Sequence, residues 1–298
     1  MALRLLLSSR PIDLPRTLGP LWRGSGDPTM HVSRSEIWRA TRTPEGPVSE
    51  RIRPRAAGIE IEAWGPGAEW ALEHAADLVG LHDDWSELRP ADPLLRTLLL
   101  RHPGLRLTRT SAVMEALIPA ILEQKVTGTE AWRAWRAIVR SHGEPAPGPG
   151  DVRLPPSPAT LAALPYYAFH PLGVERRRTE TLKRATARAA ELETLIDGPH
   201  ERAYARLLAI PGVGPWTAAE VVVRAFGDPD AVSVGDFHLP SLVSWALARE
   251  PRADDARMLE LLEPYHGHRA RVVRLLEASG IRAPRHGPRL EPRSIARI

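Results

Sequence analysis

Cysteine is absent from the sequence of 298 residues. The chain therefore forms no disulfide and offers no thiolate ligand for a zinc or iron–sulfur centre. Long apolar runs are absent as well. The opening Leu5-Leu6-Leu7 run follows Arg4 and is too short for a secretion signal, so we expect a first β-strand there, and no stretch approaches the roughly 18 apolar residues of a membrane span. The sequence predicts a cytoplasmic protein without membrane contact.

Lysine is scarce, because it occurs only at Lys125 and Lys183 and the other basic residues are arginine. Basic residues outnumber acidic ones 40 to 36, the formal net charge is +4, and the sequence pI is about 9.9. This balance mildly favours a polyanionic partner.

Two kinds of local pattern divide the chain. Short strand-like runs, among them residues 37–40 and 59–64, alternate with turn-rich stretches in the first part and predict a small antiparallel sheet. The apolar spacing of residues 68–78 predicts a helix that covers one face of this sheet. From about Asp83 onward the spacing is helical, except for a Pro- and Gly-rich stretch at 143–158 that we interpret as a surface connection.

The most informative segment is residues 207–222, where two helical patterns are joined by Pro-Gly-Val-Gly. One helical face is predicted on each side of this turn, with Ala203, Leu207 and Leu208 before it and Thr217, Val221 and Ala225 after it. Gly212 and Gly214 permit positive φ and a close approach of the backbone, and Pro215 suits the first position of the second helix. A helix start with exposed N–H groups is suited to binding phosphate without reading base sequence. A plain turn between helices is the alternative.

Asp236 follows a short apolar segment and a glycine, 20 residues beyond Trp216. A buried carboxylate can stabilise positive charge that develops on a sugar, or orient an attacking water. An aspartate after glycine is also a common helix N-cap, so the residue alone leaves both roles open.

These residues resemble the helix-hairpin-helix DNA glycosylases and, within that superfamily, the alkyl-purine branch of 3-methyladenine DNA glycosylase II. The hairpin Ile-Pro-Gly-Val-Gly-Pro-Trp-Thr-Ala-Ala at 210–219 resembles the element that names the family, and Asp236 falls at the position of its catalytic aspartate. Three further segments are similar to family motifs: Leu-Glu-Gln-Lys-Val at 122–126, Leu-Gly-Val at 172–174, and the Pro-aromatic segment at 263–270. The likeness covers roughly residues 110 to 275.

The resemblance implies a mainly α protein with an N-terminal α+β lobe, in the helix-hairpin-helix DNA glycosylase fold. We expect the α+β lobe at residues 1–80, a helical lobe with the catalytic aspartate at 81–111 together with 229–298, and a helical lobe with the hairpin at 112–228. The implied activity is the flipping of an alkylated purine out of duplex DNA and hydrolysis of its glycosidic bond.

Site residues are carried over from the same likeness. Asp236 is the expected catalytic residue, and Trp216, Glu220 and Gln124 are expected to line the base pocket. The expected DNA contacts are Gly212, Gly214, Thr217, Lys125 and His238. The hairpin carbonyls of Leu208, Ile210 and Val213 are expected to hold a structural Na⁺ or K⁺ ion, while catalysis itself needs no cofactor.

Three positions depart from the family pattern. Glu220 stands where the branch has a second pocket aromatic, and Arg274 aligns with a tryptophan of its C-terminal helix, so the pocket is expected to be less aromatic. Lys125 stands where the family places an apolar wedge; a solvated lysine is the alternative there.

The leading hypothesis is a monofunctional enzyme for 3-methyladenine- and 7-methylguanine-type lesions, because Trp216 stands where strand-cleaving relatives carry a nucleophilic lysine. Its partner is double-stranded DNA with a damaged base, and we expect a monomer in the bacterial cytoplasm, associated with the nucleoid. The alternatives are a glycosylase for oxidised or deaminated bases and a non-catalytic damage-binding protein.

Overall fold

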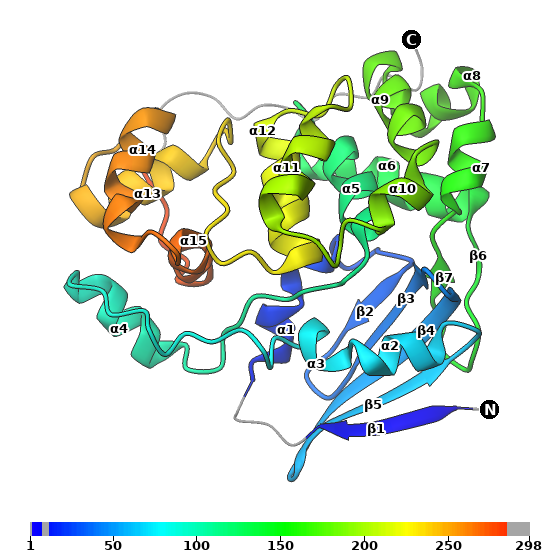
Figure 1. Cartoon of the computed structure of the whole chain (residues 1–298), viewed down its shortest axis with the longest axis horizontal. Helices are drawn as coiled ribbons and strands as arrows, with labels where there is room; N and C mark the ends of the chain where they lie inside the picture. The colour runs from blue at the N-terminus through cyan, green and yellow to red at the C-terminus, as the bar shows by residue number, and fades with distance from the viewer. Residues whose placement is uncertain (1, 8–11, 285–298) are drawn as a thin grey trace.

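An antiparallel sheet of five strands forms the base of the molecule (Figure 1). The computed structural model describes residues 2–7 and 12–284. The elements of this first lobe are β1 (Leu3–Leu7), α1 (Leu14–Thr17), η1 (Gly19–Leu21), β2 (Met30–Val32), β3 (Ile37–Thr43), β4 (Gly46–Arg55), β5 (Gly58–Trp64), α2 (Ala68–Glu73) and α3 (Ala75–Leu78). The strand order is β1-β5-β4-β3-β2. The predicted N-terminal strand and sheet are confirmed.

One face of the sheet is apolar and packs against the short helices. Ile52 pairs with Ile61 across β4 and β5 and with Ile37 across β3 and β4, and all three side chains are buried. They form one core with Leu18 of the α1–η1 turn and Val79 after α3. The alternation of apolar and polar residues therefore sets which face of the sheet is covered.

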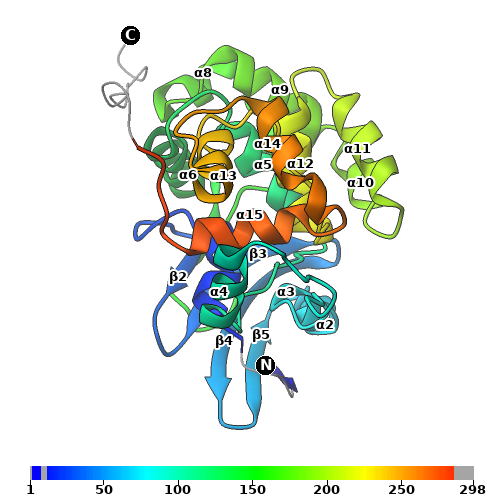
Figure 2. The same cartoon turned by 90° about the vertical axis from the view of Figure 1, so that its left-hand side faces the viewer.

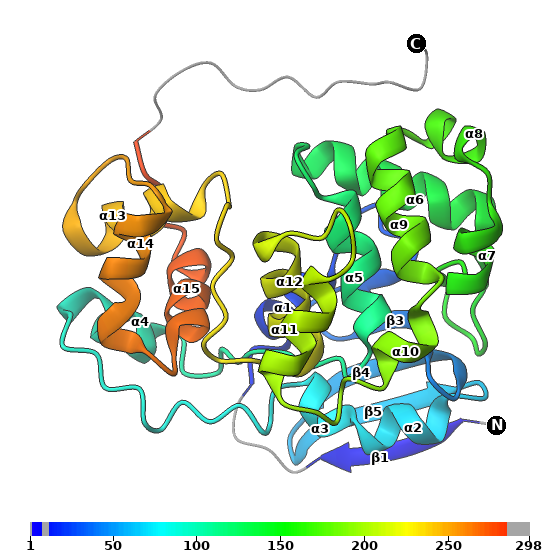
Figure 3. The same ribbon diagram turned by 45° about the horizontal axis from the view of Figure 1, so that its top comes forward.

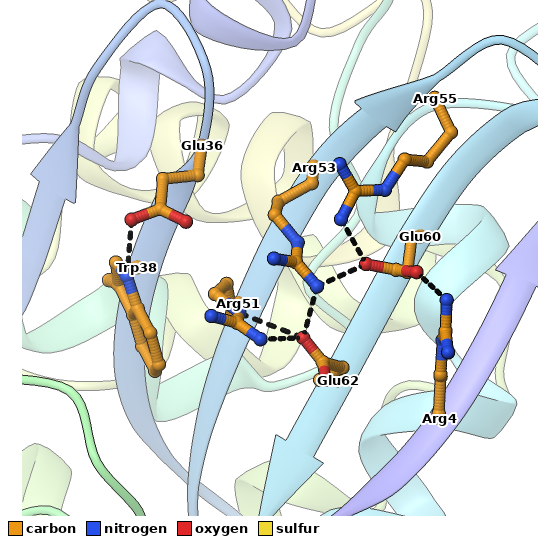
Figure 4. A network of polar contacts seen from close by, with 8 residues as sticks. All are labelled: Arg4, Glu36, Trp38, Arg51, Arg53, Arg55, Glu60 and Glu62. Carbon is orange, nitrogen blue, oxygen red and sulfur yellow. Dashed lines mark hydrogen bonds and ion pairs between the residues drawn. The ribbon is translucent and has the colours of Figure 1, made fainter.

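The opposite face carries a network of arginines and glutamates (Figure 4). Glu60 is 1% exposed and accepts hydrogen bonds from Arg4, Arg53 and Arg55, while Arg51 and Arg53 bind Glu62. The hydrogen bond from Arg55, with those from Arg4 and Arg53, lowers the pKa of Glu60 to about 2. Charge pairing between neighbouring strands thus stabilises the face that the helices leave uncovered.

The predicted helix over residues 68–78 is wrong in one detail, because it is divided into α2 and α3 at His74. The His74 ring stacks on Trp70, and its Nδ1 lies 2.8 Å from the Trp70 carbonyl oxygen. A side chain that binds a helix carbonyl competes with the regular backbone ladder.

Two helical lobes complete the chain. The lobe with the hairpin comprises α5 (Val113–Leu122), α6 (Gly128–His142), β6 (Glu144–Pro145), β7 (Arg153–Leu154), α7 (Pro158–Ala163), α8 (Tyr166–Phe169), η2 (His170–Leu172), α9 (Arg176–Thr186), α10 (Ala189–Glu193), α11 (His200–Leu208), α12 (Pro215–Val221) and the π-helix η3 (Val222–Phe226). The other comprises α4 (Pro93–Arg101), α13 (Leu239–Ala248), α14 (Asp255–Leu262), η4 (Glu263–Tyr265) and α15 (Arg269–Ala278).

Each helical lobe has its own apolar core. The first core is built around α5, whose residues Leu117 and Ile121 are fully buried against α9 and α12. The second joins α4 to the distant α13–α15, so that Leu95 shares a core with Val243 and Leu275 (Figure 2). Residues 285–298, which the sequence assigns to this second lobe, lie outside the described residues. Within the described residues, no helix is both long and apolar enough to cross a membrane.

The Gly- and Pro-rich connection lies largely at the surface, as the sequence predicts, and one side of it covers part of the N-terminal sheet. It contains the two short strands β6 and β7, which pair with each other, and it packs against the N-terminal sheet. A Cβ on Gly148 would lie 2.6 Å from Trp64, and one on Gly150 would lie 2.4 Å from Trp38. Glycine is needed here because the connection lies directly on two stacked tryptophan rings.

A buried ion cluster ties the sheet to the hairpin lobe. Arg39 of β3 binds Glu50 of β4 and also Glu115 of α5, whose Oε2 lies 2.7 Å from the guanidinium. Burial raises the pKa of Glu50, while the two carboxylates outweigh burial and raise that of Arg39. Removing one partner would leave an unpaired buried charge, so the cluster fixes how the two lobes meet.

Candidate functional site

The hairpin turn lies between α11 and α12, as the sequence predicts. α11 ends at Leu208, and α12 begins at Pro215 in its first turn. Gly212 has a φ of +99°, and an added Cβ would lie 2.1 Å from Thr181 Oγ1. Gly214 differs from our expectation, because its φ is −107° and nothing lies within 4 Å of an added Cβ. Of the two hairpin glycines, Gly212 alone is required by the fold itself.

The faces that pack the hairpin are largely those predicted. Ala203 and Leu207 of α11 and Thr217 and Val221 of α12 are buried. Leu208, which we expected on the same buried face, is 45% exposed. It is the last residue of α11, and Leu207 and Ile210 fill the core on either side of it.

The segment between α12 and α13 returns Asp236 to the start of the hairpin helix. The chain leaves α12 through the π-helix η3, which ends at Gly227 with a φ of +69°. It then crosses to the lobe of α13 and α14 (Figure 3). A turn in which the Asp236 amide donates to the Ser233 carbonyl, at 3.2 Å, precedes α13.

Both carboxylate oxygens of Asp236 are held. Oδ2 accepts a 2.9 Å hydrogen bond from Trp216 Nε1, and Oδ1 accepts the amides of His238 and Leu239 at 2.7 and 2.9 Å. Asp236 therefore caps the start of α13 and also contacts the tryptophan at the start of α12. The sequence leaves open whether Asp236 is a helix cap or a catalytic carboxylate, and the geometry of this one side chain allows both, because each role can use a different oxygen.

Gln124 lies against the hairpin, just beyond α5. Its Nε2 donates to the Gly212 carbonyl at 3.0 Å and to Thr217 Oγ1 at 2.8 Å. Thr217 is 2% exposed and its hydroxyl accepts this bond, so Thr217 holds Gln124 and presents almost no surface of its own for the DNA contact that the sequence predicts. The structure thus brings Gln124, Gly212, Thr217, Trp216 and Asp236 together in one region.

Glu220 lies one helical turn after Trp216, as its spacing requires. Its carboxylate accepts a hydrogen bond from Ser233 and forms an ion pair with Arg224, and the Glu220 side chain is 17% exposed. Arg274, which aligns with a family tryptophan, instead donates to the Arg16 carbonyl and to Glu277. Glu220 and Arg274, which replace family aromatics, therefore each bind a residue of another lobe.

A further carboxyl group, Glu123, lies beside this cluster. Burial raises its pKa, and the attraction of Arg224 and Arg23 opposes that effect. Burial lowers the pKa of Arg23, which is 6% exposed. Charged side chains of both signs therefore lie near Glu220, in a region where the sequence predicts fewer aromatic rings than the family pattern has.

Lys125 and His238 are both exposed. Lys125 has a φ of +54°, which is uncommon for a residue other than glycine and is often found at functional positions. The His238 ring makes an edge contact with the exposed ring of Phe237, at 4.9 Å between centroids. Both residues lie next to members of the cluster in the chain.

The three hairpin carbonyls are that of Leu208, at the end of α11, and those of Ile210 and Val213, in the turn that follows. The Ile210 carbonyl accepts the Val213 amide at 2.9 Å, and a carbonyl oxygen has a second lone pair for a cation. Neutral main-chain oxygens of this kind, here Leu208, Ile210 and Val213, fit Na⁺ or K⁺.

The sequence analysis did not identify Ser233 and Asp255. Ser233 donates to Glu220, and Asp255, at the start of α14, accepts the Gly235 amide at 3.1 Å on each oxygen. No local signal marks these residues, because each partner is at least 13 residues away in the chain. Together they fix the segment that carries Asp236 on two sides.

Comparisons with known proteins agree with this geometry, although no family model matches the chain. The probable bifunctional transcriptional activator and DNA repair enzyme AlkA of Mycobacterium tuberculosis is 32% identical over 151 residues, which are 50% of this chain and 30% of that protein. DNA-3-methyladenine glycosylase 2 of Escherichia coli is 31% identical over 137 residues, 45% of this chain and 49% of that protein. The chain thus spans half or less of the length of these curated relatives.

A solved structure extends the likeness to nearly the whole fold. The 3-methyladenine DNA glycosylase of Archaeoglobus fulgidus superposes with a TM-score of 0.77 at 20% identity, covering 92% of this chain and 97% of the other. The N-terminal sheet, the hairpin lobe and the lobe of α13–α15 are therefore one known architecture. The chain is thus similar in sequence, over about half of its length, to DNA-3-methyladenine glycosylases of the AlkA type, and similar in fold to a glycosylase of this kind over nearly all of its length.

Proposed function

We propose that this protein is a monofunctional DNA glycosylase that flips an alkylated purine of the 3-methyladenine or 7-methylguanine type out of duplex DNA and hydrolyses its glycosidic bond. The observation that carries the proposal is the hydrogen bond between Trp216, at the start of the hairpin helix, and Asp236. This hydrogen bond places a fixed carboxylate and a flat apolar ring together at the start of α12, the helix whose N-terminal turn is suited to binding the DNA backbone.

The chemistry requires these two groups side by side. A flipped base leaves the stack at a cost of a few kcal/mol and needs a flat surface to rest on, which the Trp216 indole offers. As the glycosidic bond breaks, positive charge develops on the sugar, and a carboxylate held in place stabilises it without reorganising. In this proposal Asp236 supplies that charge and Gln124 and Glu220 border the base.

The reaction ends with an abasic site, because the hairpin helix offers no amine. Strand-cleaving relatives need a lysine that attacks the sugar to form a Schiff base, and Trp216 occupies that position. This argues against the oxidised-base glycosylases that carry such a lysine. The held carboxylate of Asp236 argues against a protein that only binds damage.

The DNA backbone would approach the hairpin turn, with the main chain of Gly212 and Gly214 facing phosphate and the buried Thr217 holding Gln124 beside them. Lys125 would enter the gap left by the flipped nucleotide or pair with a phosphate, and His238 would donate to a phosphate nearby. A Na⁺ or K⁺ ion on the carbonyls of Leu208, Ile210 and Val213 would hold the turn in shape and add positive charge there. We further propose that the protein acts as a monomer, in the cytoplasm and on the bacterial nucleoid.

A panel of duplexes tests the proposal. Each duplex carries one defined lesion: 7-methylguanine, 3-methyladenine, hypoxanthine, uracil or 8-oxoguanine. After incubation, alkali cleaves any abasic site, and gel electrophoresis measures it. We expect cleavage of the two alkylated duplexes only after alkali treatment. Release of 8-oxoguanine with strand breakage before alkali would favour the alternative, and no release from any duplex would leave a binding protein.

A further inference from the structure

Two side-chain hydrogen bonds join α12 to the segment that carries Asp236. Trp216 Nε1 donates to Asp236 Oδ2 at 2.9 Å, and Ser233 Oγ donates to Glu220 Oε1. Trp216 and Glu220 are four residues apart and share one face of the helix. Ser233 and Asp236 are three residues apart on the facing segment. The two bonds therefore form neighbouring links between the same two elements, which we call the paired links.

Ser233 and Asp236 are mechanically coupled. The Asp236 amide donates to the Ser233 carbonyl at 3.2 Å, which closes a turn over these four residues. Ser233 is 8% exposed, so its hydroxyl lies in a poorly solvated environment where a bond to a carboxylate is strong. A shift of Ser233 away from Glu220 would thus be passed to the backbone of Asp236.

Glu220 is itself fixed from the other side. Its second oxygen pairs with Arg224, one turn further along the helix, and the Arg224 side chain is only 17% exposed. Both carboxylate oxygens of Glu220 are therefore used inside the protein. Because Arg224 fixes the Glu220 carboxylate, Glu220 is suited to hold Ser233 and the segment around it against α12.

We propose that Glu220 is a positioning residue, which acts through Ser233 to set the carboxylate of Asp236 at the distance that base excision requires. The inference rests on the proposed glycosylase function and adds a residue to its machinery. A side chain placed about 1 Å from its productive position can cost on the order of 100-fold in rate. The hydrogen bond between Ser233 and Glu220 prevents such a displacement of Asp236, because it holds the chain just before α13 begins.

The serine is the better residue to change, because Glu220→Gln would also leave Arg224 as an unpaired buried cation. Ser233→Ala removes the link and changes no charge. Ser244→Ala is the matched control: this serine of α13 is also buried and donates to the Glu250 carbonyl at 2.9 Å, with no contact to α12 among its hydrogen bonds. Both variants lose one buried hydroxyl in the same lobe.

The experiment measures single-turnover excision from the best lesion duplex of the panel, affinity for a duplex with an abasic-site analogue, and the melting temperature. We expect Ser233→Ala to lower the excision rate by about tenfold, a modest part of the loss that misplacement can cause, with affinity within twofold. We expect Ser244→Ala to lose a similar amount of stability and keep the wild-type rate. In the double variant Glu220→Ala/Ser233→Ala, the rate should equal that of Glu220→Ala, because either change alone already removes the hydrogen bond between Ser233 and Glu220.

Each contrary result has a distinct meaning. Two results would overturn this inference and leave the proposed function intact, provided that the wild-type protein is active. One is a Ser233→Ala variant that excises the base at the full rate. The other is a double variant whose rate loss equals the product of the two single losses. Equal rate losses in Ser233→Ala and Ser244→Ala would also overturn it, since they would indicate general loosening of the lobe. A wild-type protein that releases no base would overturn the proposed function and this inference together.

Discussion

The indole nitrogen of Trp216 and the Oδ2 atom of Asp236 lie 2.9 Å apart, joined by a hydrogen bond across the two helical lobes. The other oxygen of Asp236 caps α13 through the amides of His238 and Leu239. One carboxylate thus fixes the start of α13 relative to the start of α12. A side chain held at both oxygens is already oriented before DNA binds, which is the condition for electrostatic catalysis without reorganisation.

Replacement of Asp236 by Asn should nearly abolish base release while the fold persists. Asparagine caps a helix about as well as aspartate, so its Oδ1 can keep the amides of His238 and Leu239. The charge that stabilises the developing cation is lost, and a few hundredfold or more of the rate should go with it, on the order of 3–4 kcal/mol. Affinity for an abasic-site duplex should stay within a few-fold, since the carboxylate acts on the transition state.

Asp254→Asn serves as the control for this experiment. Asp254 caps α14 by accepting the Arg257 amide at 2.9 Å, so the change exchanges another capping carboxylate for an amide in the same lobe. Its excision rate should match the wild type. Undiminished turnover in Asp236→Asn would rule out the mechanism.

The sequence predicts those parts of the site whose residues lie close together in the chain, and it does not predict contacts between distant residues. The hairpin and Asp236 lie within about 30 residues of each other and are predicted from the sequence. Glycine, proline and the spacing of apolar residues determine the local structure of such a segment. The link from Ser233 to Glu220 was not predicted, since it depends on how η3 and the following segment turn. Composition identifies the Pro- and Gly-rich connection as a surface link, but it does not reveal that the glycines of this connection lie against Trp38 and Trp64, which are about 100 residues away in the chain.

Borohydride should trap no covalent adduct between the protein and lesion DNA. Trapping requires an amine that attacks the sugar, and the only lysines are Lys125 and Lys183. Lys183 donates to the Leu164 carbonyl at 2.7 Å, away from Asp236 in the fold. The assay compares this protein with a strand-cleaving glycosylase under the same conditions, on a denaturing gel. A trapped band that Lys125→Ala removes would make Lys125 a nucleophile and end the monofunctional assignment.

Glu60 should make the N-terminal sheet sensitive to acid. The arginines around Glu60, with Arg55 the largest influence, lower its folded pKa from 4.5 to about 2. A lowered folded pKa means that the stabilisation is complete above pH 4.5 and is lost as the pH falls towards about 2. The difference in melting temperature between wild type and Glu60→Gln should therefore be constant above pH 4.5 and shrink below it. A difference that is unchanged at pH 3 would contradict the assignment, and Glu45→Gln, in the exposed β3–β4 turn, controls for the loss of one carboxylate.

Lys125 should contribute to DNA binding at some cost to the fold. Its φ of +54° is unfavourable for a lysine and costs about 1–2 kcal/mol. Lys125→Gly should therefore raise the free energy of unfolding by about 1 kcal/mol, since glycine adopts this conformation readily. If the ammonium group pairs with phosphate, the same change should reduce the salt slope of DNA affinity by about one on a log–log plot. Lys183→Ala, which removes the other lysine, should leave the slope unchanged, and an unaltered slope in Lys125→Gly would place that side chain in solvent.

The two hairpin glycines should respond to alanine in opposite ways. At Gly212 the fold forbids a side chain, because φ is +99° and the added Cβ would lie 2.1 Å from Thr181 Oγ1. Gly212→Ala should lower the free energy of unfolding by more than about 1 kcal/mol.

Gly214 is the cleaner test of the DNA contact. Its φ of −107° suits alanine and nothing lies within 4 Å of an added Cβ, so Gly214→Ala should raise the free energy of unfolding by about 0.4–1 kcal/mol through the unfolded chain. The same methyl group would stand where the hairpin backbone meets phosphate, so affinity should fall for lesion and undamaged duplexes alike. The salt slope should change little, because no cation is removed. Chemical denaturation and equilibrium binding at several salt concentrations measure both effects on one variant. A Gly214→Ala protein that is more stable and still binds both duplexes at full strength would show that this side of the hairpin lies outside the interface.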